Sequence, residues 1–137
     1  MADLSITAAS VVAASDATTE AGTAGATITA GQVVYKEASS GQYKLADTDS
    51  ATAEVRVPRG IALHAASSGQ PLKILTKGGI TIGATVAVGI GYWLSGTAGG
   101  ICPVADVAAG DYPAFLGIGT STTAIKVNIT ESGAVMV

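Results

Sequence analysis

The chain has few aromatic side chains and few charges. Of its 137 residues, 4% are aromatic and 12% are charged, whereas charged residues make up about a quarter of an ordinary soluble domain. A core without large aromatic anchors must be built from Val, Ile, Leu and Ala. A surface with so little charge must be covered by Ser, Thr, Gly and Ala. This composition is more typical of a protein partly covered by partners than of a freely diffusing enzyme.

Basic charge is also scarce. The formal net charge is −3, and no run of Lys or Arg occurs in the sequence. Because proteins that bind nucleic acid need a basic surface to neutralise phosphates, we exclude nucleic acid as a partner.

The sequence predicts neither a disulfide nor a membrane span. Cys102 is the single cysteine, so no intrachain disulfide can form, and a buried filler in or near a strand is expected. The longest uncharged run lies between Lys77 and Asp106, but glycines and Pro103 interrupt it repeatedly. A spanning helix needs about 20 predominantly apolar residues. The first residues also lack a basic region followed by an apolar stretch, so no signal peptide is expected. We therefore expect a soluble protein without a membrane partner.

Alternation of apolar and polar residues, bounded by Gly, Ser, Asp and Pro, recurs along the chain. In the segment 124–129, Ile125, Val127 and Ile129 share one face, and the polar residues between them share the other. Such alternation predicts β-strands. Because the strands are short and the turn signals are close together, we expect an all-β fold, either a small β-barrel or a sandwich.

An internal repeat divides the chain into two similar halves, residues 28–79 and 80–133. Ile28-Thr29-Ala30-Gly31 matches Ile80-Thr81-Ile82-Gly83, and the segment 41–47 matches the segment 100–106 because both end in Ala-Asp. The segments 60–63 and 72–76 parallel 117–119 and 125–130. Each half then supplies about four strands, and the pair closes one core of about eight.

Residues 1–27 fall outside the repeat and precede a barrel domain of residues 28–137. Leu4-Ser5-Ile6-Thr7 and Val11-Val12 predict an edge strand, and the segment 14–27 has no apolar side chain larger than Ala. Such a segment is expected to be an extended arm or a mobile loop. We expect its removal to leave the barrel folded.

No pattern of catalytic or ligand-binding residues is present. His64 is the only histidine, and no Gly-x-Ser-x-Gly sequence occurs, so a catalytic triad has little support. Asp47 and Asp49 could form half of a calcium loop, but the remaining ligands are missing. The glycine pairs are not followed by Gly-Lys-Ser/Thr, which a phosphate-binding loop requires. We predict no enzyme activity, no cofactor and no metal site.

Aromatic residues offer the one candidate interface, formed by Tyr92, Trp93 and Tyr112. If Tyr92-Trp93-Leu94 is a strand, Tyr92 and Leu94 share one face and Trp93 points to the other. One of the two aromatic side chains then lies outside the core, where Tyr and Trp often anchor interfaces. In one interpretation these residues form a binding surface. In the other, Trp93 fills the core and Tyr92 lies on the surface.

Several segments resemble the cement or head-decoration proteins of tailed bacteriophages. They are Ala-Gly-x-Val-Val-Tyr at 30–35, Gly-x-Tyr-Lys-Leu-Ala-Asp at 41–47, Arg-Gly-Ile-Ala-Leu at 59–63, Gly-Gly-Ile-Thr-Ile-Gly-Ala-Thr-Val at 78–86, Ala-Gly-Asp-Tyr at 109–112 and Leu-Gly-Ile-Gly-Thr at 116–120. The resemblance implies a β-barrel or β-tulip-like subunit, often trimeric, on the outside of the expanded head. It implies no catalytic residues.

From these observations the leading hypothesis is a structural virion protein that binds the major capsid protein as a homotrimer and stabilises its lattice. Its location is then the outer surface of the capsid, and the host cytoplasm during assembly. The alternative is a carbohydrate- or receptor-binding module on a phage or cell surface, which an exposed platform of Tyr92, Trp93 or Tyr112 favours. A small hydrolase is a third and weaker hypothesis.

Overall fold

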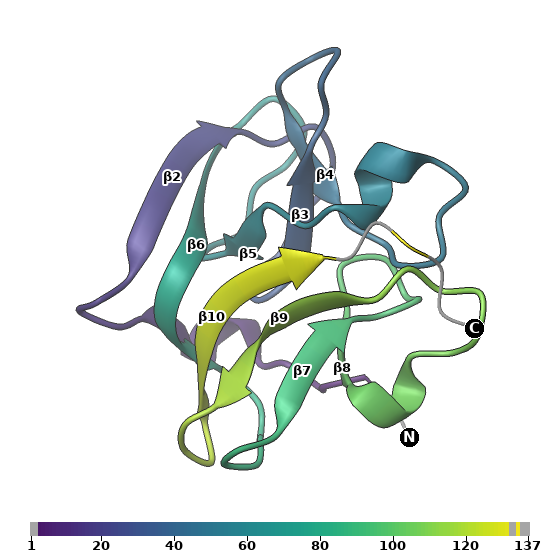
Figure 1. Cartoon of the computed structure of the whole chain (residues 1–137). Coiled ribbons are helices and arrows are strands. Elements are labelled where there is room, and N and C mark those ends of the chain that lie inside the picture. The colour runs from purple at the N-terminus through teal and green to yellow at the C-terminus, as the bar shows by residue number, and fades with distance from the viewer. Residues whose placement is uncertain (1–2, 132–133, 135–137) are drawn as a thin grey trace.

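The computed structural model describes residues 3–131 and 134, and nearly all of its regular structure is β. Of three short 3₁₀ turns, η1 precedes the first strand, and η2 and η3 lie between strands (Figure 1). The turns are η1 (Ala8–Ser10), η2 (Ala53–Arg56) and η3 (Val104–Asp106). The strands are β1 (Val11–Ala13), β2 (Thr18–Thr23), β3 (Val33–Lys36), β4 (Tyr43–Leu45), β5 (Gly60–Ala62), β6 (Pro71–Ile82), β7 (Gly91–Leu94), β8 (Ile101–Pro103), β9 (Ala114–Gly119) and β10 (Ala124–Glu131).

All strand pairs are antiparallel and belong to one curled sheet. The strand order is β4-β3-β5-β6-β10-β9-β7-β8, and β1 and β2 also pair with β6. Figure 1 shows β2 on one side of β6 and both β5 and β10 on the other. The predicted all-β, barrel-like fold is confirmed.

The two halves of the sheet are built alike. Outward from the central pair, one half reads β6-β5-β3-β4 and the other reads β10-β9-β7-β8. In each half the fourth strand along the chain is innermost, followed by the third, the first and the second. The prediction of two similar halves is therefore confirmed. The boundary expected between residues 79 and 80 falls inside β6, and residue 133 lies outside the described residues.

Hydrogen bonds show which residues of the two halves are equivalent. Gly31 donates its backbone N–H to the carbonyl of Ala62, and Gly89 donates to Gly119, both at 2.8 Å. Both donor glycines have positive φ, 91° and 80°. Gly31 therefore matches Gly89, and its predicted match to Gly83 is wrong. Because Gly, Thr and Ala are so common here, the sequence can be aligned with itself at several offsets, and only the turn geometry selects one.

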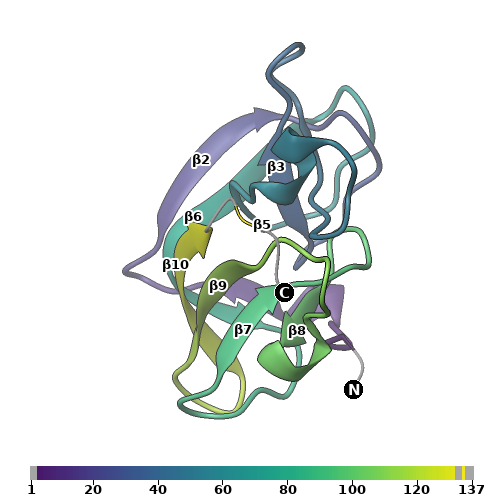
Figure 2. The ribbon, with the colours of Figure 1, turned by 45° about the vertical axis from the view of Figure 1, so that its right-hand side comes forward.

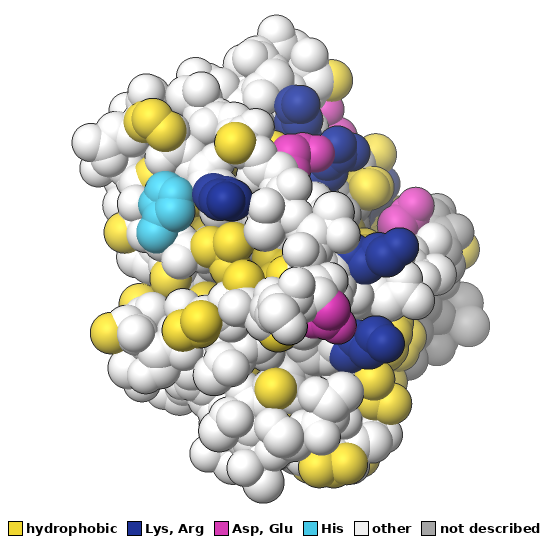
Figure 3. All heavy atoms as spheres, turned by 90° about the vertical axis from the view of Figure 1, so that its left-hand side faces the viewer, with side chains coloured by type: hydrophobic (Ala, Val, Ile, Leu, Met, Phe, Trp, Pro, Cys, Tyr) yellow, Lys and Arg dark blue, Asp and Glu magenta, His cyan; other side chains and the backbone are white. Residues whose placement is uncertain are grey.

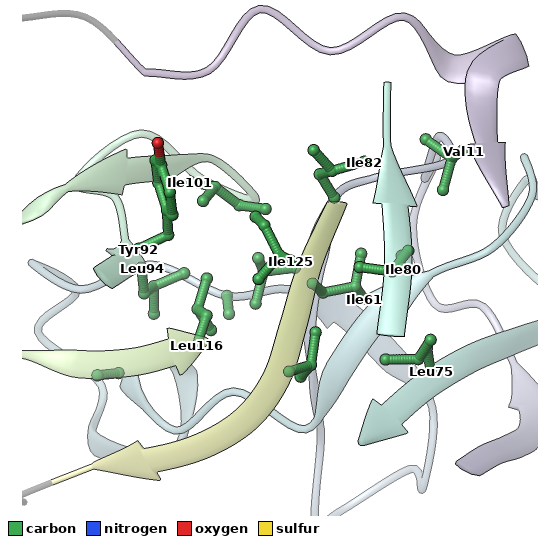
Figure 4. Packing of buried hydrophobic residues seen from close by; sticks show 14 of the residues in the cluster. Val11, Ile61, Leu75, Ile80, Ile82, Tyr92, Leu94, Ile101, Leu116 and Ile125 are labelled. Atoms are coloured by element: carbon green, nitrogen blue, oxygen red, sulfur yellow. The ribbon is translucent and has the colours of Figure 1, made fainter. Parts of the chain in front are cut away.

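The interior of the barrel is filled by aliphatic side chains from both halves. Figure 4 shows Ile61, Leu75, Ile80 and Ile125 pointing toward one another across the central strands. A second, smaller cluster surrounds the fully buried Tyr43. Its other members are Ala24, Ile28, Val34, Ala62, Ala66, Leu72 and Ile74.

The barrel is closed by a turn between the outer strands of the two halves. Gly99, which follows β7, donates its N–H to Ala46 at 2.7 Å and accepts a hydrogen bond from Val33 at 3.0 Å. Figure 2 shows the halves facing each other, with β3 and β5 above and β9, β7 and β8 below. Because β3, β4 and β7 meet through this turn, the two halves enclose one core.

The N-terminal segment is extended, as predicted, but it is an integral part of the sheet. β1 and β2 pair along β6, and Ala24 is fully buried in the smaller cluster. Gly22 lies so close to Tyr43 that an added Cβ would be 2.5 Å from its ring. The segment is anchored by backbone hydrogen bonds and small residues, which a search for large apolar side chains overlooks. Because the segment pairs with β6 and contributes Ala24 to the core, we now expect removal of residues 1–27 to destabilise the barrel.

The long strand β6 bends sharply at Gly78 and Gly79. Gly78 has a φ of 99°, and a Cβ on it would lie 2.6 Å from the carbonyl oxygen of Asp16. Gly79 donates its N–H to the Asp16 carboxylate at 3.0 Å. Only a glycine combines this left-handed backbone with so close an approach of a neighbouring chain.

We predict that Gly78→Ala lowers the free energy of unfolding by about 3 kcal/mol or more, because strain and a backbone clash add. The matched control is Gly69→Ala, since Gly69 also has positive φ, 87°, but has no atom within 4 Å of an added Cβ. The control should cost only about 1 kcal/mol of strain. Urea unfolding of both variants measures the difference. Equal losses would contradict the role of the bend.

Candidate interaction surface

Two aromatic side chains lie next to each other on the outer face of β7 and β9. Trp93 of β7 is the cross-strand partner of Phe115 of β9. Their ring centroids are 5.3 Å apart at an interplanar angle of 73°, which is a favourable edge-to-face arrangement. Cys102 of β8 is the partner of Trp93 on its other side, and its thiol is buried. The residues that β8, β7 and β9 place side by side on this face are thus apolar.

Exposed aliphatic side chains extend this row into a patch. Ile118 of β9 is 42% exposed, Ile90 is 44% exposed and Val88 is 66% exposed. Ile90 and Ile118 are neighbours because Gly91 pairs with Ile118 and the Ile90 carbonyl accepts a hydrogen bond from Gly119. Val88 belongs to the same turn, in which Gly89 donates its N–H to the Gly119 carbonyl. We call the set the apolar patch, and it comprises Val88, Ile90, Trp93, Phe115 and Ile118.

The structure decides which face of β7 is buried. Tyr92 is only 5% exposed and Leu94 is fully buried, both in the core. The Tyr92 hydroxyl oxygen accepts a hydrogen bond from the Ala87 N–H at 2.9 Å. Trp93 therefore lies outside the core, and the interpretation that places it inside is wrong. Because Tyr92 is buried, it is not part of an interaction surface.

Tyr112, the third predicted residue, is held by a different part of the chain. Its carbonyl accepts a hydrogen bond from the Thr48 hydroxyl at 2.6 Å, and the Arg56 guanidinium lies 3.5 Å from its ring centroid. This distance is typical of a cation–π contact. The three predicted aromatic residues therefore do not form one platform. Trp93 alone belongs to the apolar patch.

Four residues of the patch were missed by reasoning from the sequence. Phe115 and Ile118 belong to one strand, but the register of the β7–β9 pairing shifts between them. Because a bulge breaks the period of two, the alternation of this segment does not show that both residues face outward. The alternation around Trp93 predicts which face of the strand it occupies. It does not predict that Phe115 lies beside it on the neighbouring strand.

An ion pair joins β2 to the segment before β5. The Arg59 guanidinium contacts the Glu20 carboxylate with Nη2 to Oε1 at 2.5 Å, and the Tyr43 hydroxyl also donates to Glu20. Hydrogen bonds from Arg59 and then Tyr43 lower the pKa of Glu20 from 4.5 to about 2. Burial and the same hydrogen bond raise the pKa of Tyr43. The ion pair therefore connects β2 with the segment before β5, and both of these strands pair with β6.

A group of carboxylates, Asp47, Asp49 and Asp111, lies in the segments that follow β4 and η3. Burial and the neighbouring Asp49 raise the pKa of Asp47 to about 6, and Asp111 adds to the effect. The Asp49 N–H donates to the Asp47 carboxylate at 3.2 Å, which is an Asx turn. Residues 3–131 and 134 contain no group of three or more His, Cys, Asp or Glu residues arranged to hold a metal ion.

The contacts of His64 and the burial of Cys102 indicate structural roles for both residues. The Nε2 of His64 accepts a hydrogen bond from the Lys73 N–H at 3.1 Å, so the ring supports the β5–β6 connection. Burial raises the pKa of the Cys102 thiol to about 12, which keeps it protonated near neutral pH. Within the described part of the chain, no helix is long and apolar enough to cross a membrane.

No model of a known protein family matches this chain, and no curated protein sequence matches it. Its function is therefore inferred from the residues and their geometry.

We predict that Glu20→Gln lowers the free energy of unfolding at pH 7 by about 1 kcal/mol, because it removes the ion pair. The pKa of Glu20 is lower in the folded than in the unfolded chain, so its contribution is complete above pH 4.5 and is lost as the pH falls through about 2. The difference between variant and wild type should shrink over that range. Urea unfolding from pH 7 to pH 2 measures it.

The control for this measurement is Glu131→Gln, since Glu131 is exposed at the end of β10. It should leave stability nearly unchanged at every pH. A Glu20→Gln deficit that stays constant down to pH 2 would contradict the assigned ion pair.

Proposed function

We propose that this chain is a structural virion protein that binds the outside of a tailed-phage head and stabilises the lattice of the major capsid protein. The observation that carries the proposal is the apolar patch on a rigid sheet. Exposed aliphatic side chains beside the partly exposed Trp93 and Phe115 suit a protein interface. The low charge of the whole chain and the segments that resemble decoration proteins support the same assignment.

Stabilisation follows from mass action. A protein that binds only the assembled lattice favours that lattice over free subunits. The patch fits this task because Trp93 and Phe115 are already ordered against each other, so little side-chain entropy is lost on binding. A homotrimer presents three patches together, which raises the avidity far above that of one contact. We therefore propose a trimer located on the outer surface of the capsid.

We predict that the double variant Ile90→Ser/Ile118→Ser weakens binding to undecorated phage heads by about tenfold or more, because it removes exposed apolar side chains from the patch. The matched control is Val12→Ser, since Val12 is 59% exposed on β1, outside the patch. Sedimentation of each protein with heads measures the bound fraction. The control should bind as the wild type does.

Two results would contradict the proposal. Wild-type protein that fails to pellet with mature heads would exclude the capsid function. Heads that bind the patch variant as well as the wild type would exclude the patch as the contact. If heads do not bind, a glycan array tests the alternative of a carbohydrate-binding module, for which the partly exposed Trp93 is the residue to substitute.

A further inference from the structure

Two shallow clefts lie on either side of Arg59. One, of about 370 Å³, is lined by Lys77 of β6 and Asn128 of β10 among others. The other, of about 390 Å³, is lined by Lys36 of β3 and Val57. Arg59 and the adjacent Pro58 border both clefts. The clefts are therefore neighbours on one surface.

Basic side chains border this surface. Lys36, Lys77 and Lys126 are exposed, and within the described residues none of them forms an ion pair. Lys126 is two residues along β10 from Asn128, the partner of Lys77. Figure 3 shows that basic side chains on this side of the molecule gather toward one edge, with acidic side chains among them. We call Lys36, Arg59, Lys77 and Lys126 the basic strip.

The carboxylates inside the clefts are already engaged. Glu20 is paired with Arg59, and Glu54 accepts a hydrogen bond from the Ala38 N–H at 3.3 Å. The lysines of the strip are thus available to an acidic partner. Val57, which is 45% exposed in the second cleft, gives that partner an apolar contact as well.

Acidic side chains lie on the other side of the molecule. Asp49 and Asp111 act together on Asp47, and Asp3, Asp106 and Asp111 act together on Cys102. In Figure 1 the segment after β4 and η3 lie on the right, whereas β2 and β6 lie on the left. Val104, next to these carboxylates in the chain, is 54% exposed. We call the segments 47–49 and 104–111 the acidic loops.

We propose that the basic strip of one copy binds the acidic loops of a second copy. The two surfaces are opposite in charge, each includes an exposed valine, and they lie on different sides of the molecule. The contact is therefore heterologous, joining copies head to tail. A heterologous contact forms a ring when its rotation closes. This inference rests on the proposed function in one respect. On the capsid, the ring that the contact forms is the proposed trimer.

Charge substitution tests the contact with purified protein alone. Lys77→Glu and Asp49→Lys, each a single variant, should weaken self-association by about tenfold, because each places like charges opposite one another. Combining them in one chain should largely restore association, since the contact between residues 77 and 49 is then reversed in sign at each interface while the other charges are unchanged. Controls are Lys73→Glu, an exposed lysine of β6 outside the cleft linings, and Glu131→Lys. Sedimentation velocity over a range of concentrations measures the association constants.

Association should also weaken when the salt concentration rises from about 50 to 500 mM, because salt screens exposed charges. A monomeric wild-type protein at low salt would overturn the inference. So would a Lys77→Glu variant that associates like the wild type, or a double variant that folds but stays as weak as the single ones. None of these measurements uses heads. If the charge-reversal variants behave as predicted but the protein fails to bind heads, the proposed function is rejected and the contact between copies stands.

Discussion

The bend of β6 at Gly78 and Gly79 is the constraint on which the rest of the structure depends. β6 pairs with β1 and β2 on one side and with β5 and β10 on the other. Its first part supports one half of the sheet and its last part supports the other. Because the strand turns between these parts, the two halves face each other and enclose a core. Asp16 fixes the bend by accepting a hydrogen bond from Gly79.

This arrangement separates the surfaces by their chemistry. Interior positions are taken by aliphatic residues, Tyr35 and Tyr92. Trp93 of β7 and Phe115 of β9 face outward. Lys77 and Lys126 lie on the central strands β6 and β10, whereas Asp47 and Asp49 follow the outermost strand β4. A chain with so few charges can thus carry surfaces of different chemistry on one small barrel.

The sequence predicted what depends on local pattern. Alternation identified an all-β fold and the shared face of Tyr92 and Leu94, and recurring short motifs indicated two similar halves. It could not give the register of the repeat, because the hydrogen bonds of the left-handed turn at Gly89 decide it. It also missed that residues 14–27 join the sheet. Their attachment depends on backbone hydrogen bonds and on the contact of Gly22 with Tyr43.

The candidate surface was predicted only in part for a related reason. Trp93 was found because one residue of an aromatic pair on a strand must leave the core. Its partner Phe115 is distant in sequence, and strand pairing brings the two together. Long-range pairing of this kind has no local signal. Tyr112 was grouped with them only because it is aromatic, whereas its contact is with Arg56.

Electron cryomicroscopy of tailed-phage heads incubated with this protein tests the proposed capsid role most directly. The account predicts density for this barrel on the outer capsid surface, above junctions between major capsid proteins. The outer face of β7 and β9 should point toward the shell. Heads that lack this density, or a barrel located in a tail or fibre, would contradict a role in stabilising the capsid.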